Sequence, residues 1–289
     1  MSTNNSLGGP FTFSGTTKTI NRIGYGAIQL TGPMAWGEPR DRDAALAVVR
    51  ETIALGINHI DTSDYYGPHI ANQIIKEAIY PYPKDLVIVT KVGAKRGADK
   101  SWPKALSPED LTVAVHDNLR NLGLEALDIV NLRVGQAHTT DEASIAGPLE
   151  TLIKLKEQGL IQHIGLSNVS YTQFKEAEAM TDIVCVQNHY NLAYRKDDAL
   201  IEELAAKGIA FVPFFPMGGF RPLQSPILDS IAESKGVTPK QIALAWLLQR
   251  SSNVLIIAGT SSVDHLRENV RIGDIKLTAS ELNELENLF

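Results

Sequence analysis

Two carboxylates and two phenols stand close together in the segment 61–67, which reads Asp-Thr-Ser-Asp-Tyr-Tyr-Gly. The residues before it are typical of a short strand, so these groups are expected in the loop that follows a strand. A phenol is a poor acid at neutral pH because its pKa is about 10, and a nearby ammonium lowers that pKa by favouring the phenolate. Lys91 ends a later strand-like segment and could supply the ammonium, while Asp61 could hold Lys91 charged and in place. The residue types therefore suit general acid catalysis, in which a tyrosine donates a proton to a developing alkoxide.

Each of these residues also has a structural interpretation when it is taken alone. An Asp at a strand end often caps a loop, and a Lys there is usually a solvated charge. Nothing in isolation chooses between Tyr65 and Tyr66. The combination with Lys91 and Arg133 on consecutive strands favours catalysis, because neighbouring strands lie about 4.8 Å apart and their carboxyl ends face one active site in a barrel.

Strand-like and helix-like segments alternate along the whole chain. Eight strands are expected at Ile23–Ile28, Asn58–Thr62, Leu86–Lys91, Leu127–Arg133, Ile161–Ser167, Ile183–Asn188, Ile209–Phe214 and Val254–Gly259. The helices between and after them are expected over residues 41–55, 69–79, 108–122, 142–158, 171–180, 197–207, 239–250 and 263–271. Eight such repeats predict an α/β fold in which parallel strands close into a (β/α)8 TIM barrel.

Three further segments extend this predicted barrel. Residues 11–20 alternate around a Ser-Gly turn and predict an N-terminal β-hairpin, and extra helices are expected near 225–235 and 278–288. An open doubly wound sheet is the alternative, but its G-x-G-x-x-G nucleotide fingerprint is missing after the first strand. Since no change in composition marks a linker, residues 1–289 are expected to form a single domain.

Composition narrows the class of protein. The hydrophobic fraction of 44% and charged fraction of 21% are those of a globular protein with a sizeable core. The net charge of −6 argues against nucleic-acid binding, and no apolar run reaches the roughly 18 residues needed to span a membrane. The single cysteine, Cys185, permits no intrachain disulfide and lies in an apolar run, where a buried side chain is expected. We expect a cytoplasmic protein without a metal site, either a monomer or a weak homo-oligomer.

Several strings resemble the aldo-keto reductases in order along nearly the whole chain. They are the segment 61–67, Val-Ile-Val-Thr-Lys at 87–91, Gly-Leu-Ser-Asn at 165–168 and Val-Gln-Asn at 186–188. The resemblance implies a barrel that binds NADP(H) without a Rossmann domain and transfers hydride between the nicotinamide and a small-molecule carbonyl substrate. By position in the family's D-T-x-x-x-Y-G motif, it also implies that Tyr66 is the acid and Tyr65 is not.

One position departs from the family pattern. Members usually carry a histidine at the end of the fourth strand, where this chain has Arg133. An arginine can donate hydrogen bonds to a substrate oxygen and stabilise negative charge there, but it cannot relay a proton near neutral pH. His138 could reach the site from the following loop, although a surface histidine is the alternative. The catalytic set implied by the resemblance is therefore Tyr66, Asp61, Lys91 and Arg133.

The resemblance also implies the residues that bind the cofactor. Ser167, Asn168 and Gln187 end two strands and carry groups suited to a carboxamide, and Phe214 could stack on the nicotinamide. Glycine at 218 and 219 would let backbone N–H groups approach a pyrophosphate. The expected cofactor residues are Gly26, Ala27, Ser167, Asn168, Gln187, Phe214, Met217, Gly219, Gly259, Thr260, Ser261, His265, Arg267, Glu268 and Asn269.

The last of these residues form a polar loop that feeds a helix N-terminus, a place that favours phosphate. The loop resembles the family's adenosine 2′-phosphate site, but Gly259 and Ser261 stand where many members have a Lys or Arg. His265 and Arg267 are the remaining cations, and Arg267 could equally be a solvated helix charge. NADP(H) is the expected cofactor, and its preference over NAD(H) stays open.

Within the family, the strings at 66–69, 130–134, 184–191 and 213–220 most resemble the bacterial pyridoxal reductases. That subgroup implies reduction of pyridoxal to pyridoxine by NADPH and the reverse reaction. Trp36, Trp102 and Phe220 are candidates for an aromatic pocket around a flat ring, although loop tryptophans can also simply pack on the barrel rim. The alternatives are a reductase of broad aldehyde and ketone specificity and an NADP(H)-binding redox-sensing subunit.

Overall fold

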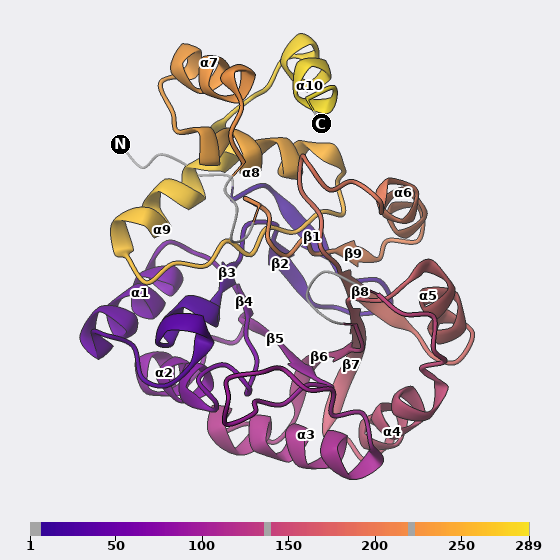
Figure 1. The fold of residues 1–289 in the computed structure, drawn as a ribbon. Helices are drawn as coiled ribbons and strands as arrows, with labels where there is room; N and C mark the ends of the chain where they lie inside the picture. Colours follow the sequence, from indigo (N-terminus) through magenta and orange to yellow (C-terminus); the bar gives the residue numbers. More distant parts are fainter. Residues whose placement is uncertain (1–6, 136–139, 219–222, 289) are drawn as a thin grey trace.

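The computed structural model describes residues 7–135, 140–218 and 223–288. Its main sheet has seven parallel strands in sequential order, and helices surround this sheet (Figure 1). The strands are β3 (Tyr25–Gly26), β4 (His59–Asp61), β5 (Val87–Val92), β6 (Leu127–Arg133), β7 (Ile161–Ser167), β8 (Ile183–Gln187) and β9 (Ala210–Phe211). Each strand pairs in parallel with the next, as right-handed βαβ connections require.

The predicted eighth strand closes the ring through isolated bridges instead of a continuous ladder. Val254 bridges Phe211 of β9 on one side, while Ile256 and Gly259 bridge Ile23 and Gly26 on the other. Backbone hydrogen bonds run from Leu255 N to Phe211 O and from Ile256 N to Arg22 O, at 2.9 and 2.8 Å. Residues 254–259 therefore join the first and last strands of the sheet, and the predicted (β/α)8 barrel is confirmed.

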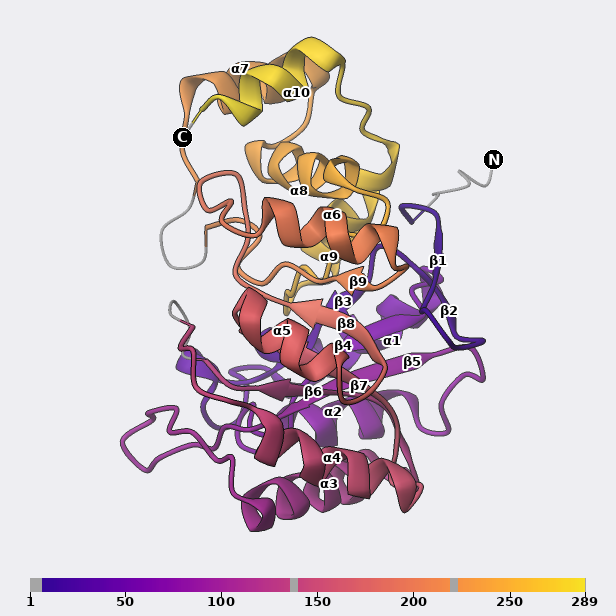
Figure 2. The same ribbon diagram turned by 90° about the vertical axis from the view of Figure 1, so that its right-hand side faces the viewer.

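Ten α-helices lie in the described residues, and most agree with the expected ranges within a few residues. They are α1 (Arg42–Ala54), α2 (Ile70–Ile79), α3 (Pro108–Leu122), α4 (Ala146–Glu157), α5 (Tyr171–Glu178), α6 (Asp198–Ala206), α7 (Pro226–Lys235), α8 (Pro239–Arg250), α9 (Val263–Val270) and α10 (Ala279–Glu286). The two extra helices expected beyond the barrel are α7 and α10, which pack together outside α8 (Figures 1 and 2). Helix α4 begins later than expected because the Ile145 N–H and the Ser144 hydroxyl bind the Glu176 carboxylate.

Two short 3-10 helices lie in the loop between β3 and α1, and a third follows α9. They are η1 (Ala27–Leu30), η2 (Pro33–Ala35) and η3 (Arg271–Asp274). Because η1 follows directly after Gly26, strand β3 is shorter than the expected Ile23–Ile28. Within the described part of the chain, every helix is too short or too polar to cross a bilayer.

The predicted hairpin closes one end of the barrel. Its strands β1 (Pro10–Thr12) and β2 (Thr19–Asn21) are antiparallel and lie at one end of the sheet (Figure 2). Phe13 and Ile20 pack with Val87 and Val89 at the beginning of β5, and Cys185 is buried in the same apolar cluster. Since apolar side chains fill this end, polar chemistry is confined to the carboxyl ends of the strands.

Candidate active site

A buried ion pair lies at the carboxyl ends of β4 and β5. The Lys91 ammonium donates to Asp61 Oδ1 at 2.5 Å and to the Thr62 carbonyl at 3.1 Å. The Lys91 and Asp61 side chains are only 3% and 5% exposed, and Gln187 Nε2 donates to Asp61 Oδ2 at 3.0 Å. The expected contact between Asp61 and Lys91 is therefore present, and three strands of the sheet contribute to it.

The Tyr66 ring lies beside this pair, with Lys91 Nζ 5.3 Å from the ring centroid. Burial raises the pKa of the Tyr66 phenol, and the nearby Asp61 carboxylate raises it further, while Arg133 lowers it. The expected lowering of this pKa by Lys91 stays a prediction, since the Asp61 carboxylate 2.5 Å from the ammonium raises the pKa of the phenol. Arg133 lowers the pKa of the Tyr66 phenol, but burial and Asp61 outweigh it, so Tyr66 holds its proton at neutral pH.

Tyr65 is also buried and meets Tyr66 edge to face, with ring centroids 5.4 Å apart. Burial raises the pKa of Tyr65 to about 12, and the charges of Arg133 and Lys91 both oppose this rise. Tyr66, and not Tyr65, has its ring against the Lys91 ammonium. This geometry agrees with the assignment of Tyr66 as proton donor, which stays a prediction.

Arg133 ends β6 and lies over the Phe214 ring, with 5.6 Å between the guanidinium carbon and the centroid. No Asp or Glu forms a salt bridge with Arg133 in the part of the chain that the structure describes. An unpaired guanidinium beside a buried phenol can stabilise negative charge that develops on a substrate oxygen. His138, which could have assisted Arg133, lies outside the described residues, as do Gly219 and Phe220.

The two expected pocket tryptophans, Trp36 and Trp102, are joined by Arg96, a residue that the sequence alone did not indicate. Its guanidinium carbon lies 3.7 Å from the Trp102 ring centroid and 5.1 Å from that of Trp36. Arg96 also donates to the backbone carbonyls of two loops, those of Met34, Ala35 and Lys100. Trp102 in turn meets the Tyr65 ring at 5.3 Å and the Tyr66 ring at 6.4 Å. The two tryptophans and Arg96 therefore form one aromatic wall beside the phenols.

The residues expected around the carboxamide lie on neighbouring strand ends. Ser167 on β7 is in register with Arg133 on β6 and with Gln187 on β8. The Ser167 hydroxyl is buried and has no hydrogen-bond partner among the described residues, so it is available to a bound group. Asn168 is buried and left-handed (φ 57°), and Met217 lies half-buried in the loop after β9. Such a set suits a polar amide, and the assignment stays a prediction.

The second part of the expected cofactor site begins where the barrel closes. A Cβ atom on Gly26 would lie 2.4 Å from the Ile257 carbonyl oxygen, and one on Gly259 would lie 2.6 Å from the Gly26 carbonyl oxygen. Both positions therefore require glycine, because the segments around Gly26 and Gly259 approach each other closely. Because Gly26 also pairs with Asp61 of β4, this segment is continuous with the ion-pair site. Ala27 follows as a buried residue at the start of η1.

The polar loop leads into α9, as expected. The Thr260 carbonyl accepts from the Tyr25 hydroxyl at 2.7 Å, and the Ser262 side chain caps the helix. Ser261, His265 and Glu268 are exposed, and Asn269 is partly buried. Arg267 is also exposed, but its Nε donates to Glu51 of α1 at 2.8 Å. The cation expected at a 2′-phosphate is thus already engaged by a carboxylate.

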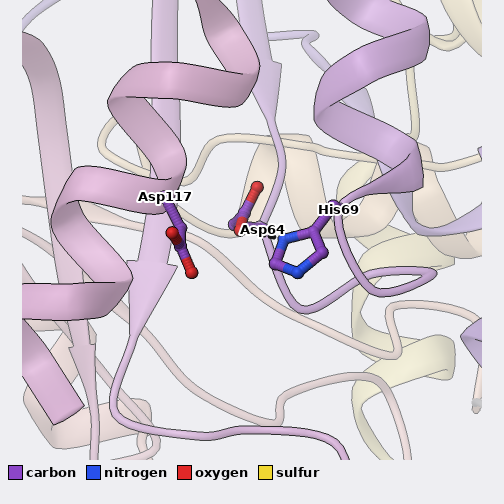
Figure 3. Close-up of side chains that lie close together, drawn as sticks. All are labelled: Asp64, His69 and Asp117. Atoms are coloured by element: carbon purple, nitrogen blue, oxygen red, sulfur yellow. Dashed lines mark hydrogen bonds and ion pairs between the residues drawn. The ribbon is translucent and has the colours of Figure 1, made fainter.

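Asp64, His69 and Asp117 form a second titratable cluster, with ligand atoms within 4.8 Å of one another (Figure 3). The geometry could suit a metal, but His69 Nδ1 is hydrogen-bonded to Asp64 Oδ2 at 2.6 Å. Asp117 pairs with Arg120 on its own helix. These bonds account for the cluster, and we do not assign a metal to it.

A barrel whose open end holds a buried Asp–Lys pair beside a buried phenol and an arginine suits acid–base chemistry on a small molecule. The model of the aldo/keto reductase family matches residues 22–289. The chain belongs to that family, and the resemblance noted in the sequence is confirmed.

Individual relatives support this assignment. The chain is 59% identical over 279 residues to the pyridoxine 4-dehydrogenase of Escherichia coli, covering 96% of this chain and 98% of that protein. It is 38% identical to an uncharacterized oxidoreductase of Schizosaccharomyces pombe, covering 94% of this chain and 89% of that protein. Among solved structures, a thermostable aldo-keto reductase bound to the inhibitor epalrestat aligns with a TM-score of 0.82 and 29% identity, over 97% and 99% of the two chains. An aldo/keto reductase of Klebsiella pneumoniae in complex with NADP and acetate has the same fold, with a TM-score of 0.79 and 23% identity over 96% and 94% of the chains.

Proposed function

We propose that this chain is an NADP(H)-dependent carbonyl reductase that interconverts pyridoxal and pyridoxine. The observation that carries the reductase activity is the Tyr66 phenol, buried and protonated beside the Asp61–Lys91 pair and Arg133. The assignment of pyridoxal as substrate rests on the relative named pyridoxine 4-dehydrogenase, which is 59% identical over nearly the full length of both chains.

The cofactor assignment is supported by one buried hydroxyl at the strand ends. The buried Ser167 hydroxyl lacks a partner among the described residues, and it lies beside Gln187 at the strand ends. Ser167, Asn168 and Gln187 would hold the carboxamide, Phe214 would cover the ring, and the loop at 259–269 would take the adenosine end. NADP(H), which the Klebsiella pneumoniae protein binds, supplies or accepts the hydride.

The protein's own part in the reaction is to bind the carbonyl and move one proton. Tyr66 donates its phenolic proton to the carbonyl oxygen as that oxygen gains negative charge, and Arg133 donates a hydrogen bond to the same oxygen. Lys91 and Arg133 stabilise the phenolate left behind, while Asp61 fixes Lys91 beside the ring. In the oxidation direction, the Tyr66 phenolate removes the hydroxyl proton by the reverse path.

The aromatic wall formed by Trp36, Arg96 and Trp102 is evidence for a flat aromatic substrate. Trp36, Arg96 and Trp102 form a surface that reaches the Tyr65 and Tyr66 rings, and a pyridine ring can stack on such a surface. We further propose that the protein acts in the cytoplasm, where thiols stay reduced, as a monomer or weak homo-oligomer; its single cysteine, Cys185, is free and buried.

Steady-state kinetics with pyridoxal and benzaldehyde test this proposal. We expect NADPH-dependent reduction of pyridoxal with a kcat/KM at least about a hundredfold above that for benzaldehyde, a difference of about 2.7 kcal/mol in transition-state binding. Similar values for both aldehydes would favour a reductase of broad specificity. Tight NADPH binding without turnover of any aldehyde would contradict the enzyme assignment and favour a redox sensor.

A further inference from the structure

A buried carboxylate that the proposed mechanism does not use lies inside the catalytic loop. Asp64 stands between Asp61 and Tyr66 and is 5% exposed. No Lys or Arg forms a salt bridge with it in the described ranges 7–135, 140–218 and 223–288. A buried charge is costly unless it is hydrogen-bonded, so the contacts of Asp64 need an explanation.

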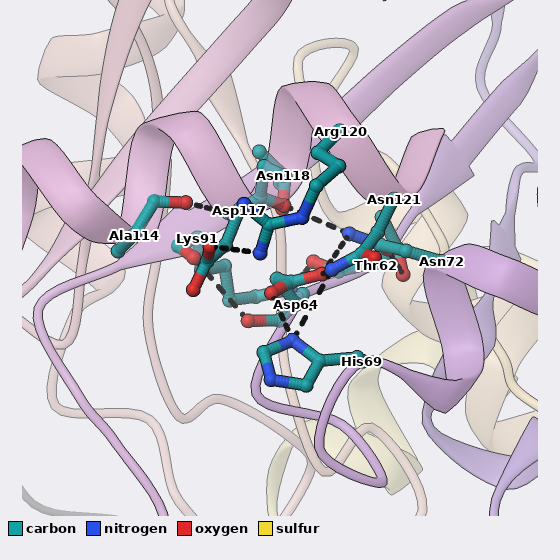
Figure 4. Close-up of polar contacts among 12 residues, drawn as sticks. Thr62, Asp64, His69, Asn72, Lys91, Ala114, Asp117, Asn118, Arg120 and Asn121 are labelled. Carbon is teal, nitrogen blue, oxygen red and sulfur yellow. Dashed lines mark hydrogen bonds and ion pairs between the residues drawn. The ribbon is translucent and has the colours of Figure 1, made fainter. Parts of the chain in front are cut away.

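Three side chains from beyond the loop hold the Asp64 carboxylate (Figure 4). His69 Nδ1 lies 2.6 Å from Oδ2, while Asn72 Nδ2 and Asn121 Nδ2 donate to Oδ1 at 3.0 and 2.9 Å. The His69 backbone N–H also donates to the Asp64 carbonyl at 2.6 Å. Asn72 belongs to α2 and Asn121 to α3, so the carboxylate fastens the loop to two helices.

The same hydrogen bonds continue to the ion pair of the active site. Asn72 Oδ1 accepts from the Thr62 hydroxyl at 2.8 Å, and the Thr62 carbonyl accepts from Lys91 Nζ at 3.1 Å. Asn72 Nδ2 also donates to Asn118, which is fully buried and accepts from the Thr90 hydroxyl on β5. The network thus connects the loop that carries Tyr66 with the strand that carries Lys91.

We propose that Asp64 is a positioning residue for Tyr66, and that its carboxylate, held by His69 and two asparagines, fixes the phenol beside the Asp61–Lys91 pair. This inference rests on the proposed function, because it assumes that Tyr66 is the proton donor. A helix-capping role alone would not require the network to reach Thr62 and Lys91.

His69 makes the attachment sensitive to pH. Asp64 raises the pKa of His69 by its hydrogen bond, and the charge of Asp117 on α3 acts in the same direction. Partial burial and Arg120 on α3 oppose the rise. Because the folded-state pKa of His69 is above its unfolded value of about 6.5, the attraction is fully present below that pH. It is lost as the pH rises through the higher folded-state pKa, and solvent weakens it because the His69 side chain is 45% exposed.

Three single variants separate positioning from general stability. Asp64→Asn keeps the shape of the side chain and removes its charge. His69→Asn keeps a neutral N–H donor near the Nδ1 position, and asparagine tolerates the left-handed backbone of this residue (φ 69°). Asp117→Asn is the matched control, since it removes a neighbouring carboxylate that makes no hydrogen bond to the loop in the described structure.

The measurement is the single-turnover rate of hydride transfer from NADPH to pyridoxal across the pH range, together with the Kd for NADPH. We expect Asp64→Asn to slow transfer about tenfold, because a misplaced donor raises the barrier, with a change in Kd of less than about twofold. His69→Asn should be slower than wild type in acid and should approach it as the pH rises. Asp117→Asn should keep the wild-type rates at both pH limits and move only the midpoint to lower pH, because it removes a charge that raises the pKa of His69.

Folded Asp64→Asn protein with a rate within about twofold of wild type would overturn the inference, as would a His69→Asn profile parallel to wild type. If Asp64→Asn does not fold, the His69→Asn profile alone decides. Failure of the proposed function is a different result, since wild-type protein would then reduce no aldehyde.

Discussion

Replacing Lys91 by methionine leaves the Asp61 carboxylate buried without its cation. The two charged atoms lie 2.5 Å apart, and the side chains are 3% and 5% exposed. At an effective dielectric constant of about 20, two charges at that distance attract by about 7 kcal/mol, part of which offsets their desolvation. Since removing one partner of a buried pair costs about 3–5 kcal/mol, we expect Lys91→Met to lower the free energy of unfolding by that amount.

A second substitution separates the structural from the chemical part of this loss. Asp61→Asn combined with Lys91→Met removes both charges and keeps an acceptor for Gln187 Nε2. The double variant should recover most of the lost stability, because an uncharged pair costs far less to bury. It should not recover hydride transfer, because the phenolate of Tyr66 then lacks the ammonium.

Urea unfolding, followed by tryptophan fluorescence and circular dichroism, measures these stabilities. Lys175→Met is the matched control, since Lys175 forms ion pairs on the surface of α5 and should unfold near the wild-type urea concentration. A loss below about 1 kcal/mol for Lys91→Met would refute this account of the pair. A double variant as unstable as the single one would refute it equally.

Three further predictions concern individual site residues. Arg133→Ala should lose far more turnover than His138→Ala in steady-state assays, because the guanidinium lies beside the phenols without a carboxylate partner among the described residues and can stabilise charge on the substrate oxygen. The reverse ranking would contradict this. Arg96→Met should raise the KM for pyridoxal about tenfold, because it loosens the loop that carries Trp102, and should leave kcat for a small aliphatic aldehyde unchanged. Equal effects on both substrates would contradict a role of Arg96 in the aromatic wall. Arg267→Ala should weaken NADPH binding and spare NADH binding in a fluorescence titration, because the pair of Arg267 with Glu51 is exposed and a 2′-phosphate can replace the carboxylate. Equal affinity for both cofactors in wild-type protein would show that this helix does not select the phosphate.

The barrel could be predicted because each βαβ repeat leaves a local signal, an apolar run followed by helical periodicity and caps such as Ser107-Pro108. The exception is the closing segment at 254–259. It has the composition of a strand but makes only isolated bridges, because the register there is set by contacts with residues far away in the chain. Helix α4 begins later than predicted for a similar reason, because the Ile145 N–H is bound by Glu176, which lies 31 residues further along the chain.

Site residues at strand ends could be predicted from the sequence, whereas those that depend on contacts between loops could not. Asp61 and Lys91 end neighbouring strands, so their contact followed from the fold. Arg96 was missed because two of its three carbonyl partners lie in another loop, 61 and 62 residues earlier. The signal that could have revealed it is an arginine in the same loop as Trp102. Lys91 was expected to lower the pKa of Tyr66, but only the structure shows how closely Asp61 compensates its charge.

The central claim is that Tyr66 gives the proton in an NADPH-dependent reduction of pyridoxal. The most direct test compares single-turnover reduction by wild type, Tyr66→Phe and Tyr65→Phe, with the Kd for NADPH measured in parallel. We predict that Tyr66→Phe lowers the rate by at least about a hundredfold with NADPH affinity retained, whereas Tyr65→Phe keeps most of the rate. A large loss in Tyr65→Phe with Tyr66→Phe near wild type would contradict the account.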